Sequence, residues 1–255
     1  MITENIIRFR EKLASGQNAK GIGITLTDPA VTEALGGLAD FFWIDLEHNP
    51  TNLETLMAHL IAARAAGTAA IVRIPSSDIA WVKRVLDSGA EGILLPQAKS
   101  VEEIAEFAKA CRYPPMGNRG FGPRRPTNYG RSGGQSYLDH ANENLFVAAQ
   151  IETIDLVNQI DKVAQIKELT SLCLGPNDLS GTMGKLGQTS DPEVLDAIKK
   201  VATAARENGL FCGAGMGTDA EYANTLASLG VNWLQVGNDY DYMVKHVQQV
   251  LPTID

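Results

Sequence analysis

The sequence has few cysteines and no long apolar run. Its 255 residues include three cysteines, Cys111, Cys173 and Cys212, which are scattered and show no CxxC spacing. This pattern predicts neither a disulfide framework nor a zinc site, and we expect Cys173 and Cys212 in the core. No apolar stretch approaches the length of a membrane-spanning helix, and the first residues, MITENIIRFREKL, lack the apolar segment of a signal peptide. We therefore expect a cytoplasmic protein without a membrane partner.

Positive charge is also scarce. Asp and Glu number 30 against 22 Lys and Arg, and no cluster of basic residues stands out. This balance argues against nucleic acid or an anionic membrane as the main partner. No linker rich in Pro, Gly or Ser divides the chain, so we predict one domain over residues 1–255.

Short apolar runs alternate with segments of helical spacing. The strands are predicted at 21–26, 41–45, 69–74, 92–97, 146–152, 171–175, 211–215 and 232–237. The helices are predicted at 29–38, 52–66, 78–88, 100–111, 155–168, 191–208, 218–229 and 239–250, with an extra one at 3–15. Cap signals at Thr51, Asp191 and Thr218-Asp219, and glycines that end helices at Gly67, Gly89, Gly209 and Gly230, support these limits.

The predicted strands are continuously apolar rather than alternating. Such strands are buried on both faces, as in a parallel sheet that helices cover. Eight βα units in a chain of this length predict a (β/α)8 TIM barrel, with an open doubly wound sheet as the alternative. In such a barrel the active site lies at the carboxyl ends of the strands. The polar residues found there are Asp45, Glu47, His48, Arg73, Gln97, Gln150, Glu152 and Asp178.

Two carboxylates in this set are candidate metal ligands. Gln150 and Glu152 are two residues apart on one strand, so their side chains share a face. A buried carboxylate at Glu152 requires a cation or a shifted pKa, and Asp178 on the next loop can supply a second oxygen donor. Oxygen donors of this kind suit Mg²⁺ or Mn²⁺ better than zinc. A structural ion pair between Glu152 and Arg73 is the alternative.

His48 and Arg73 are the candidate catalytic groups. Asp45 precedes His48 by three residues and could orient its imidazole. Arg73 ends an apolar strand, where its guanidinium predicts recognition of a carboxylate or an enolate oxygen. The lysines all fall in predicted helices or loops, which disfavours imine chemistry.

Six motifs then occur in one order between residues 43 and 184: WIDLEHNP, VRIP, LDSGAEGILLPQ, RYPPMGNRGFG, QIET and LGPNDLSGTMG. Together they closely resemble the HpcH/HpaI aldolase family of metal-dependent class II pyruvate aldolases, which have a (β/α)8 fold. The resemblance implies reversible cleavage of a 4-hydroxy-2-oxo acid to pyruvate and an aldehyde, with Mg²⁺, Mn²⁺ or Co²⁺ as cofactor.

The resemblance also implies individual roles. Glu152 and Asp178 would hold the metal, and His48, oriented by Asp45, would be the base. Arg73 would contact the keto oxygen of pyruvate, with Gln150 nearby and the backbone of Gly175, Pro176 and Asn177 near the carboxylate. The family implies a hexamer, a trimer of dimers, whose subunits exchange the last helix, and draws Asp87 toward a neighbouring subunit's site.

Three other functions remain open from the sequence. An oxaloacetate decarboxylase would use the same metal and enolate. A phosphate-binding barrel isomerase would need a glycine-rich cradle, which GAGMGTD and VGNDYD supply only loosely. A non-catalytic binding protein is the third. The long connection 113–145, with Arg119, Arg124, Arg125 and Arg131, either lines the acceptor side or forms a solvated flap or subunit contact.

Overall fold

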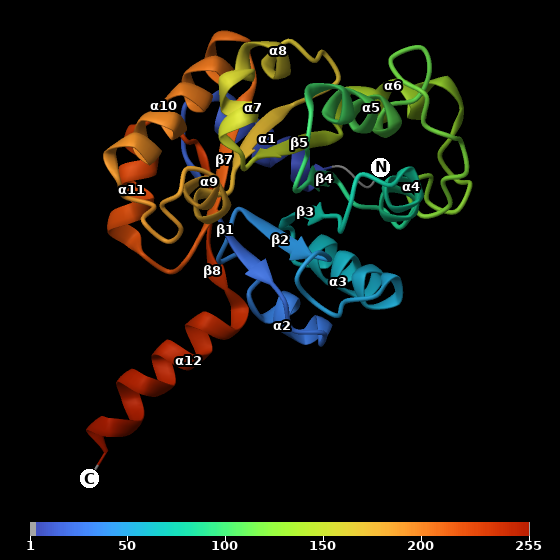
Figure 1. Ribbon diagram of the computed structural model, residues 1–255. Helices are drawn as coiled ribbons and strands as arrows, with labels where there is room; N and C mark the ends of the chain where they lie inside the picture. The colour runs from blue at the N-terminus through green and yellow to red at the C-terminus, as the bar shows by residue number, and fades with distance from the viewer. Residues whose placement is uncertain (1–3, 255) are drawn as a thin grey trace.

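A computed structural model describes residues 4–254 and shows eight parallel strands closed into a barrel (Figure 1). The strands follow one another in chain order, and β1 pairs with β8 to close the ring. Their bounds are β1 Ala19–Ile24, β2 Phe41–Asp45, β3 Ala69–Arg73, β4 Gly92–Leu95, β5 Phe146–Ile151, β6 Ser171–Leu174, β7 Phe211–Met216 and β8 Trp233–Asn238. The predicted (β/α)8 barrel is confirmed, and the open sheet is wrong.

Most of the helices lie on the outside of the barrel (Figure 1). The helices are α1 Glu4–Ala14, α2 Pro29–Ala34, α3 Leu53–Ala65, α4 Ile79–Asp87, α5 Val101–Cys111, α6 Gly134–Asn144, α7 Ile154–Asn158, α8 Ile160–Ala164, α9 Pro176–Thr182, α10 Pro192–Glu207, α11 Ala220–Ser228 and α12 Asp239–Val250, before a short 3-10 turn, η1, at Leu251–Thr253. Asp191 and Asp219 cap helices as predicted, whereas Asn52, and not Thr51, caps α3 by accepting a hydrogen bond from the Thr55 amide at 2.9 Å.

Three helical segments differ from the sequence prediction. The helix predicted at 155–168 is divided at Gln159, which has φ −109° and ψ 16°, outside the helical range. Helix α6 lies within the connection 113–145, which was predicted to be loop, and α9 begins inside the LGPNDLSG motif. The sequence signals were weak because α6 follows a glycine-rich stretch and α9 has only seven residues.

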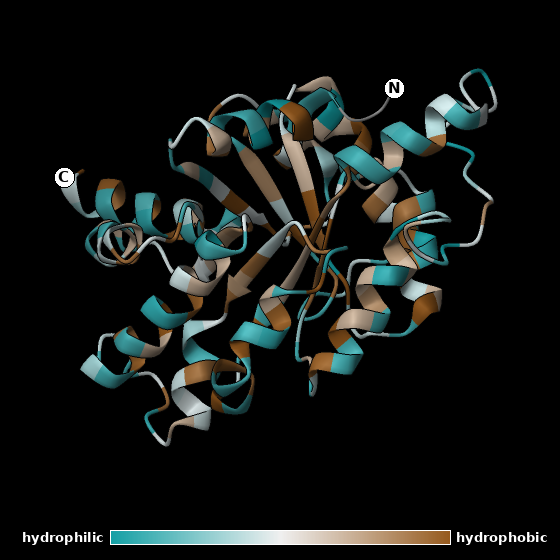
Figure 2. Cartoon of the chain, turned by 90° about the horizontal axis from the view of Figure 1, so that it is seen from above, coloured by the Kyte–Doolittle hydropathy of each residue, from teal (hydrophilic) through white to brown (hydrophobic). Residues whose placement is uncertain are grey.

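The core has two layers. Apolar side chains that point outward from the strands pack against the helices, and Figure 2 shows the brown, apolar residues concentrated on the central strands. Inside the barrel, Phe9 of α1 contacts Phe41 and Phe146 edge-on, with ring centroids 5.2 and 5.3 Å apart. Gly213 leaves the room that the indole of Trp233 occupies. The interior of the barrel is therefore a packed aromatic core.

The strand register brings polar ends together. Asp45 is the register partner of Arg73 across β2 and β3, so both side chains emerge at the same end of the barrel. β1 begins at Ala19 and so includes Lys20, contrary to the prediction that no strand holds a lysine. Lys20 is exposed near the start of its strand, the end away from the active-site mouth, so it offers no imine-forming group there.

The cysteines are in the state that their scattered positions predicted. All three cysteines are buried and free, and burial raises the pKa of Cys111 and Cys212 to about 12. Over the described residues 4–254, no helix combines the length and the apolar character that crossing a bilayer requires. Helix α12 projects from the barrel as an arm (Figure 1).

Candidate active site

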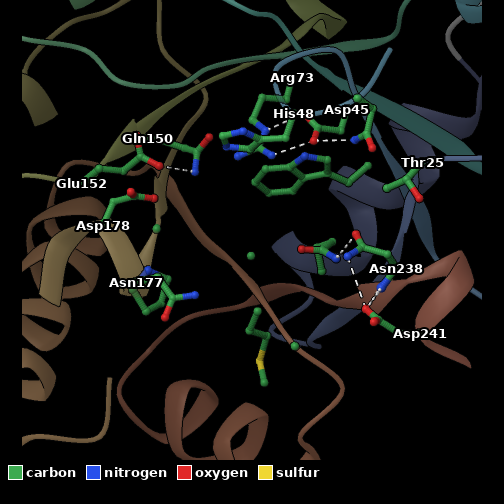
Figure 3. A pocket seen from close by; sticks show the side chains of 18 of the residues that line it. Thr25, Asp45, His48, Arg73, Gln150, Glu152, Asn177, Asp178, Asn238 and Asp241 are labelled. Carbon is green, nitrogen blue, oxygen red and sulfur yellow. Dashed lines mark hydrogen bonds and ion pairs between the residues drawn. The ribbon is translucent and has the colours of Figure 1, made fainter. Parts of the chain in front are cut away.

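A cavity of about 510 Å³ opens at the carboxyl ends of the strands. Most of the predicted site residues line it, namely Asp45, His48, Arg73, Gln150, Glu152 and the segment 175–178. They come from the ends of β2, β3 and β5 and from the loop after β6, and Figure 3 shows them converging on one space. The barrel therefore assembles residues that are more than a hundred positions apart in the chain.

Arg73 is held firmly on one side of this cavity. Asp45 accepts hydrogen bonds from its Nε and Nη2, both at 2.8 Å, and the guanidinium lies over the Trp43 ring at 5.3 Å. Burial by itself would lower the pKa of Arg73, but the hydrogen bonds and negative charge of Asp45, with the charge of Glu47, raise it. The cation is thus permanent and pre-oriented. The structure pairs Arg73 with Asp45 and Glu47 and not, as the alternative required, with Glu152.

Glu47 takes the place beside His48 that the sequence prediction assigned to Asp45. Its Oε2 lies 3.5 Å from His48 Nε2 and 3.0 Å from Arg73 Nη1. Asp45 instead binds Arg73 and accepts a hydrogen bond from the side-chain Nδ2 of Asn49 at 2.8 Å. Burial raises the pKa of Glu47, while Arg73 and then His48 oppose that rise. The carboxylate that approaches the imidazole is therefore Glu47, because the register of β2 on β3 sets Asp45 beside Arg73.

Glu152 lies at the base of the cavity and is 2% exposed. Its Oε2 accepts a hydrogen bond from the Gln97 amide at 2.7 Å, and its Oε1 accepts one from Gln150 Nε2 at 2.8 Å. Burial raises the pKa of Glu152 to about 7; the Gln97 amide lowers it, and the charge of Asp178 raises it further. Gln97 adopts a positive φ of 51°, so the chain accepts an uncommon backbone conformation where it serves this carboxylate.

The site has the donors that a hard divalent cation requires. The carboxylates of Glu152 and Asp178 lie side by side in Figure 3, and Gln150 Oε1 is buried without a hydrogen-bond partner among the described residues. Within residues 4–254, no group of three or more His, Cys, Asp or Glu side chains is arranged to hold a metal ion. Two carboxylates with the other positions left to water and ligand are typical of Mg²⁺ rather than of structural zinc. The residues therefore fit such a metal.

Gly175 controls the space beside Glu152. A Cβ at this position would lie 2.5 Å from Glu152 Oε1, closer than real side chains approach. We expect Gly175→Ala to displace the carboxylate and to weaken Mn²⁺ binding by about 10- to 100-fold, the range seen when the support of a metal ligand is altered. Isothermal titration of folded protein with Mn²⁺ measures this. Gly181→Ala, whose Cβ would meet only Leu186 Cδ1 at 3.3 Å, is the control. Unchanged affinity in Gly175→Ala would contradict the assignment.

Asp87 and the connection 113–145 lie outside this cavity. Asp87 accepts a hydrogen bond from Arg119 Nη2 at 2.7 Å. Arg125 is buried and donates to the backbone oxygens of Leu60, within α3, and of Ser88, the residue after α4, at 3.2 and 3.0 Å. No residue of 113–145 is among those that line the cavity in the described chain. Within a single chain this segment does not line the cavity, because Arg119 and Arg125 point into the fold, and the alternative of a subunit contact stays a prediction.

Sequence reasoning missed the side of the cavity that β1, β8 and the start of α12 form. The residues there are Thr25, Gln235, Asn238, Tyr240 and Asp241. VGNDYD was considered only as a phosphate cradle. The signal that could have identified them is their position at the carboxyl end of the last strand, the same criterion that selected Glu152.

Comparisons with known proteins agree with this geometry. Residues 24–245 match the model of the HpcH/HpaI aldolase/citrate lyase family. The 5-keto-4-deoxy-D-glucarate aldolase of Salmonella arizonae is 32% identical over 249 residues, 96% of each chain. The HpcH/HpaI aldolase of Desulfitobacterium hafniense DCB-2 superposes with a TM-score of 0.89 at 29% identity, covering 96% of this chain and 95% of that one.

A structure described as citrate synthase SbnG is also similar, with a TM-score of 0.85 and 29% identity, covering 99% of this chain and 97% of the other. Because relatives with different names share the fold at nearly equal identity, similarity alone does not select the substrate. The motifs, the barrel and the matched family model lead to one assignment. The chain belongs to the HpcH/HpaI aldolase/citrate lyase family and is a carbon–carbon lyase of the aldolase type.

Proposed function

We propose that the protein is a divalent-metal-dependent aldolase that reversibly cleaves a 4-hydroxy-2-oxo acid to pyruvate and an aldehyde. The observation that carries this proposal is the pairing of Glu152 with Asp178 across one cavity from Arg73. Both carboxylates would hold Mg²⁺, Mn²⁺ or Co²⁺. When bound there, the cation would act as a Lewis acid that polarises the keto group of pyruvate and stabilises its enolate.

Arg73 would complete the stabilisation of that oxygen. A guanidinium has five N–H groups, and those on Nε, Nη2 and Nη1 that face Asp45 and Glu47 are already committed. One N–H on each terminal nitrogen remains for the substrate. Because Asp45 and the Trp43 ring fix the plane of the guanidinium, these donors need little reorganisation as negative charge develops.

His48 would transfer the proton. In the cleavage direction, its imidazole would accept the proton of the C4 hydroxyl, either directly or through water. The C3–C4 bond would break, its electron pair would pass to the pyruvate enolate, and C4 would become the aldehyde carbon. The enolate would then gain a proton at C3. Gln150, Asn177 and the backbone of Gly175 and Pro176, which line the same cavity, would contact the pyruvate carboxylate.

Exchange of the methyl protons of pyruvate with solvent tests this scheme without any aldehyde. In D₂O, the protein with Mn²⁺ should exchange those protons, as NMR would report, and excess chelator should stop the exchange. Adding back Mg²⁺, Mn²⁺ or Co²⁺ should restore the proton exchange, to an extent that differs between the metals. Full exchange, or full aldolase turnover, in chelator-treated protein would reject the proposal.

The exposed surface of α12 supports an assembly of subunits. In the described chain, the helix has its main contacts with β1, β8 and the short η1 turn. Its Met243, Val247 and Val250 are 57%, 52% and 40% exposed. An isolated helix of 12 residues is marginal in water, so this apolar face requires a partner. We propose that α12 packs on another copy of the chain within a hexamer. In that assembly Asp87 would approach the neighbouring copy's site.

Charges on this face should dissociate the assembly. Met243 and Val247 are four residues apart and so lie on one side of the helix. We expect the double variant Met243→Glu, Val247→Glu to yield smaller species than the native protein, as size-exclusion chromatography with light scattering would report. Gln248→Glu on the same helix is the control. A native protein that is already monomeric would contradict this part of the proposal.

A further inference from the structure

The cavity has a second polar side that the scheme above leaves unused. It consists of Thr25, Gln235, Asn238 and Asp241, from β1, β8 and the first turn of α12, and we call it the β8 wall. In a closed barrel of eight strands in chain order, β1 lies across from β5, so this wall is opposite Glu152. Figure 3 shows Asn238 and Asp241 on the far side of the cavity from Glu152 and Asp178. A substrate bound at those carboxylates by its pyruvate end would extend its other end toward the wall.

The β8 wall is firmly positioned. Asp239 is 2% exposed and accepts hydrogen bonds from the amides of Thr25 and Leu26, both at 2.9 Å. Asn238 and Asp241 form the capping box of α12, with the Asn238 amide donating to Asp241 Oδ2 at 2.8 Å. Gly23 leaves space for Asn238, since a Cβ there would lie 2.2 Å from Asn238 Oδ1. The wall is therefore built before any ligand arrives.

Its hydrogen-bond donors are already used within the protein. The Thr25 hydroxyl donates to Asp239 at 2.5 Å. The side-chain amide of Gln235 donates to Gly237 O at 2.5 Å and faces Asn238 Oδ1 at 3.4 Å, while Asn238 Nδ2 faces Asp241 Oδ2 at 3.3 Å. Within the described residues, no hydrogen bond occupies Gln235 Oε1 or Asp241 Oδ1. What the wall offers a ligand is therefore a set of acceptor oxygens.

The charges around the cavity also favour an uncharged ligand at the β8 wall. Among the described residues that line the cavity, Arg73 is the permanent cation, and it lies on the side of β2 and β3. Asp241 places a negative charge on the β8 wall, and the amino end of α12 compensates it only in part. A carboxylate has only acceptors. At this wall it would face the charge of Asp241 without a cation, and the neighbouring donor is the Tyr240 hydroxyl, which itself accepts from Asn238 Nδ2 at 3.4 Å. A hydroxyl can donate its proton to the free oxygens.

We propose that the β8 wall is the acceptor subsite of the enzyme, that it takes an uncharged aldehyde bearing hydroxyl groups, and that Asp241 is the residue that disfavours aldehydes with a carboxylate tail. The inference rests on the aldolase function proposed above, because it assigns the second substrate of that reaction.

Acceptor selectivity of the native enzyme and of Asp241→Asn tests the proposal. Aldol addition of pyruvate to glyceraldehyde is compared with addition to succinic semialdehyde, each rate divided by the pyruvate proton exchange of the same preparation. We expect the native enzyme to favour glyceraldehyde in kcat/KM by about tenfold or more, and Asp241→Asn to reduce that preference by about tenfold, as removal of a like charge from a specificity site predicts. Glu221→Gln removes an exposed charge from α11, outside the cavity, and should keep the native ratio.

A second variant keeps the test decisive if Asp241→Asn fails to fold. Thr25→Val removes one acceptor oxygen and should lower kcat/KM for glyceraldehyde more than for propanal, which has no hydroxyl to donate. A native preference for succinic semialdehyde would overturn the proposal, and so would an unchanged ratio in a folded Asp241→Asn. Loss of pyruvate proton exchange in the native enzyme would instead reject the aldolase scheme, so the two failures are distinguishable.

Discussion

Glu152→Gln should lose metal binding and almost all pyruvate proton exchange. The substitution preserves the shape of the side chain but removes the charge that the buried carboxylate contributes beside Asp178. A bound cation is worth several kcal/mol of transition-state stabilisation, which corresponds to a rate loss of about 10³-fold or more. Mn²⁺ titration of the folded variant separates failure to bind metal from failure of the chemistry. Glu193→Gln on the exposed start of α10 is the matched control.

The same residue predicts a pH dependence of metal affinity. Burial raises the pKa of Glu152 to about 7, so below that pH a proton competes with the cation for the carboxylate. Mn²⁺ affinity should therefore increase as the pH rises toward 7 and then level off. In Glu152→Gln this part of the pH dependence should be absent. A native affinity that stays constant from pH 5 to pH 8 would show that Glu152 is not a ligand.

Arg73→Lys should reduce turnover by about 10²- to 10³-fold, the loss typical when one charge-stabilising donor is removed. Lysine retains the charge but cannot reproduce the planar fork that binds Asp45 through Nε and Nη2 and leaves further donors for substrate. Because Glu152 and Asp178 are untouched, Mn²⁺ affinity should change little. Steady-state kinetics and a Mn²⁺ titration on one preparation measure both quantities. Turnover near the native rate would remove Arg73 from the mechanism.

Arg73→Ala should affect stability as well as rate. The side chains of Arg73 and Asp45 are 14% and 7% exposed, so deleting the cation leaves buried negative charge without its partner. Breaking a buried pair in this way lowers the free energy of unfolding by about 3–5 kcal/mol. Denaturant unfolding measures this loss in Arg73→Ala. The control is Arg84→Ala, which removes an exposed arginine from α4. Equal stability of the two variants would mean that the pair contributes nothing to the fold.

Much of the fold could be predicted from the sequence because burial imposes a pattern of apolar residues on each strand and helix. Continuously apolar runs indicated the strands, and β2 and α12 occur at the limits predicted for them. The barrel rule then located the site, since polar residues that directly follow buried strands must meet at one mouth. Glu152, Asp178 and Arg73 were identified in this way, and the cavity contains all three.

Only the tertiary structure decided which charges meet. The register of β2 on β3 sets Asp45 opposite Arg73, and this leaves Glu47 to approach His48. Arg125 likewise turns inward to backbone oxygens of two helices that precede it by dozens of residues. The β8 wall exists because the last strand closes on the first. Periodicity records whether a side chain is buried, whereas the choice of its partner depends on segments that are distant in the chain, and only closure of the barrel brings those together.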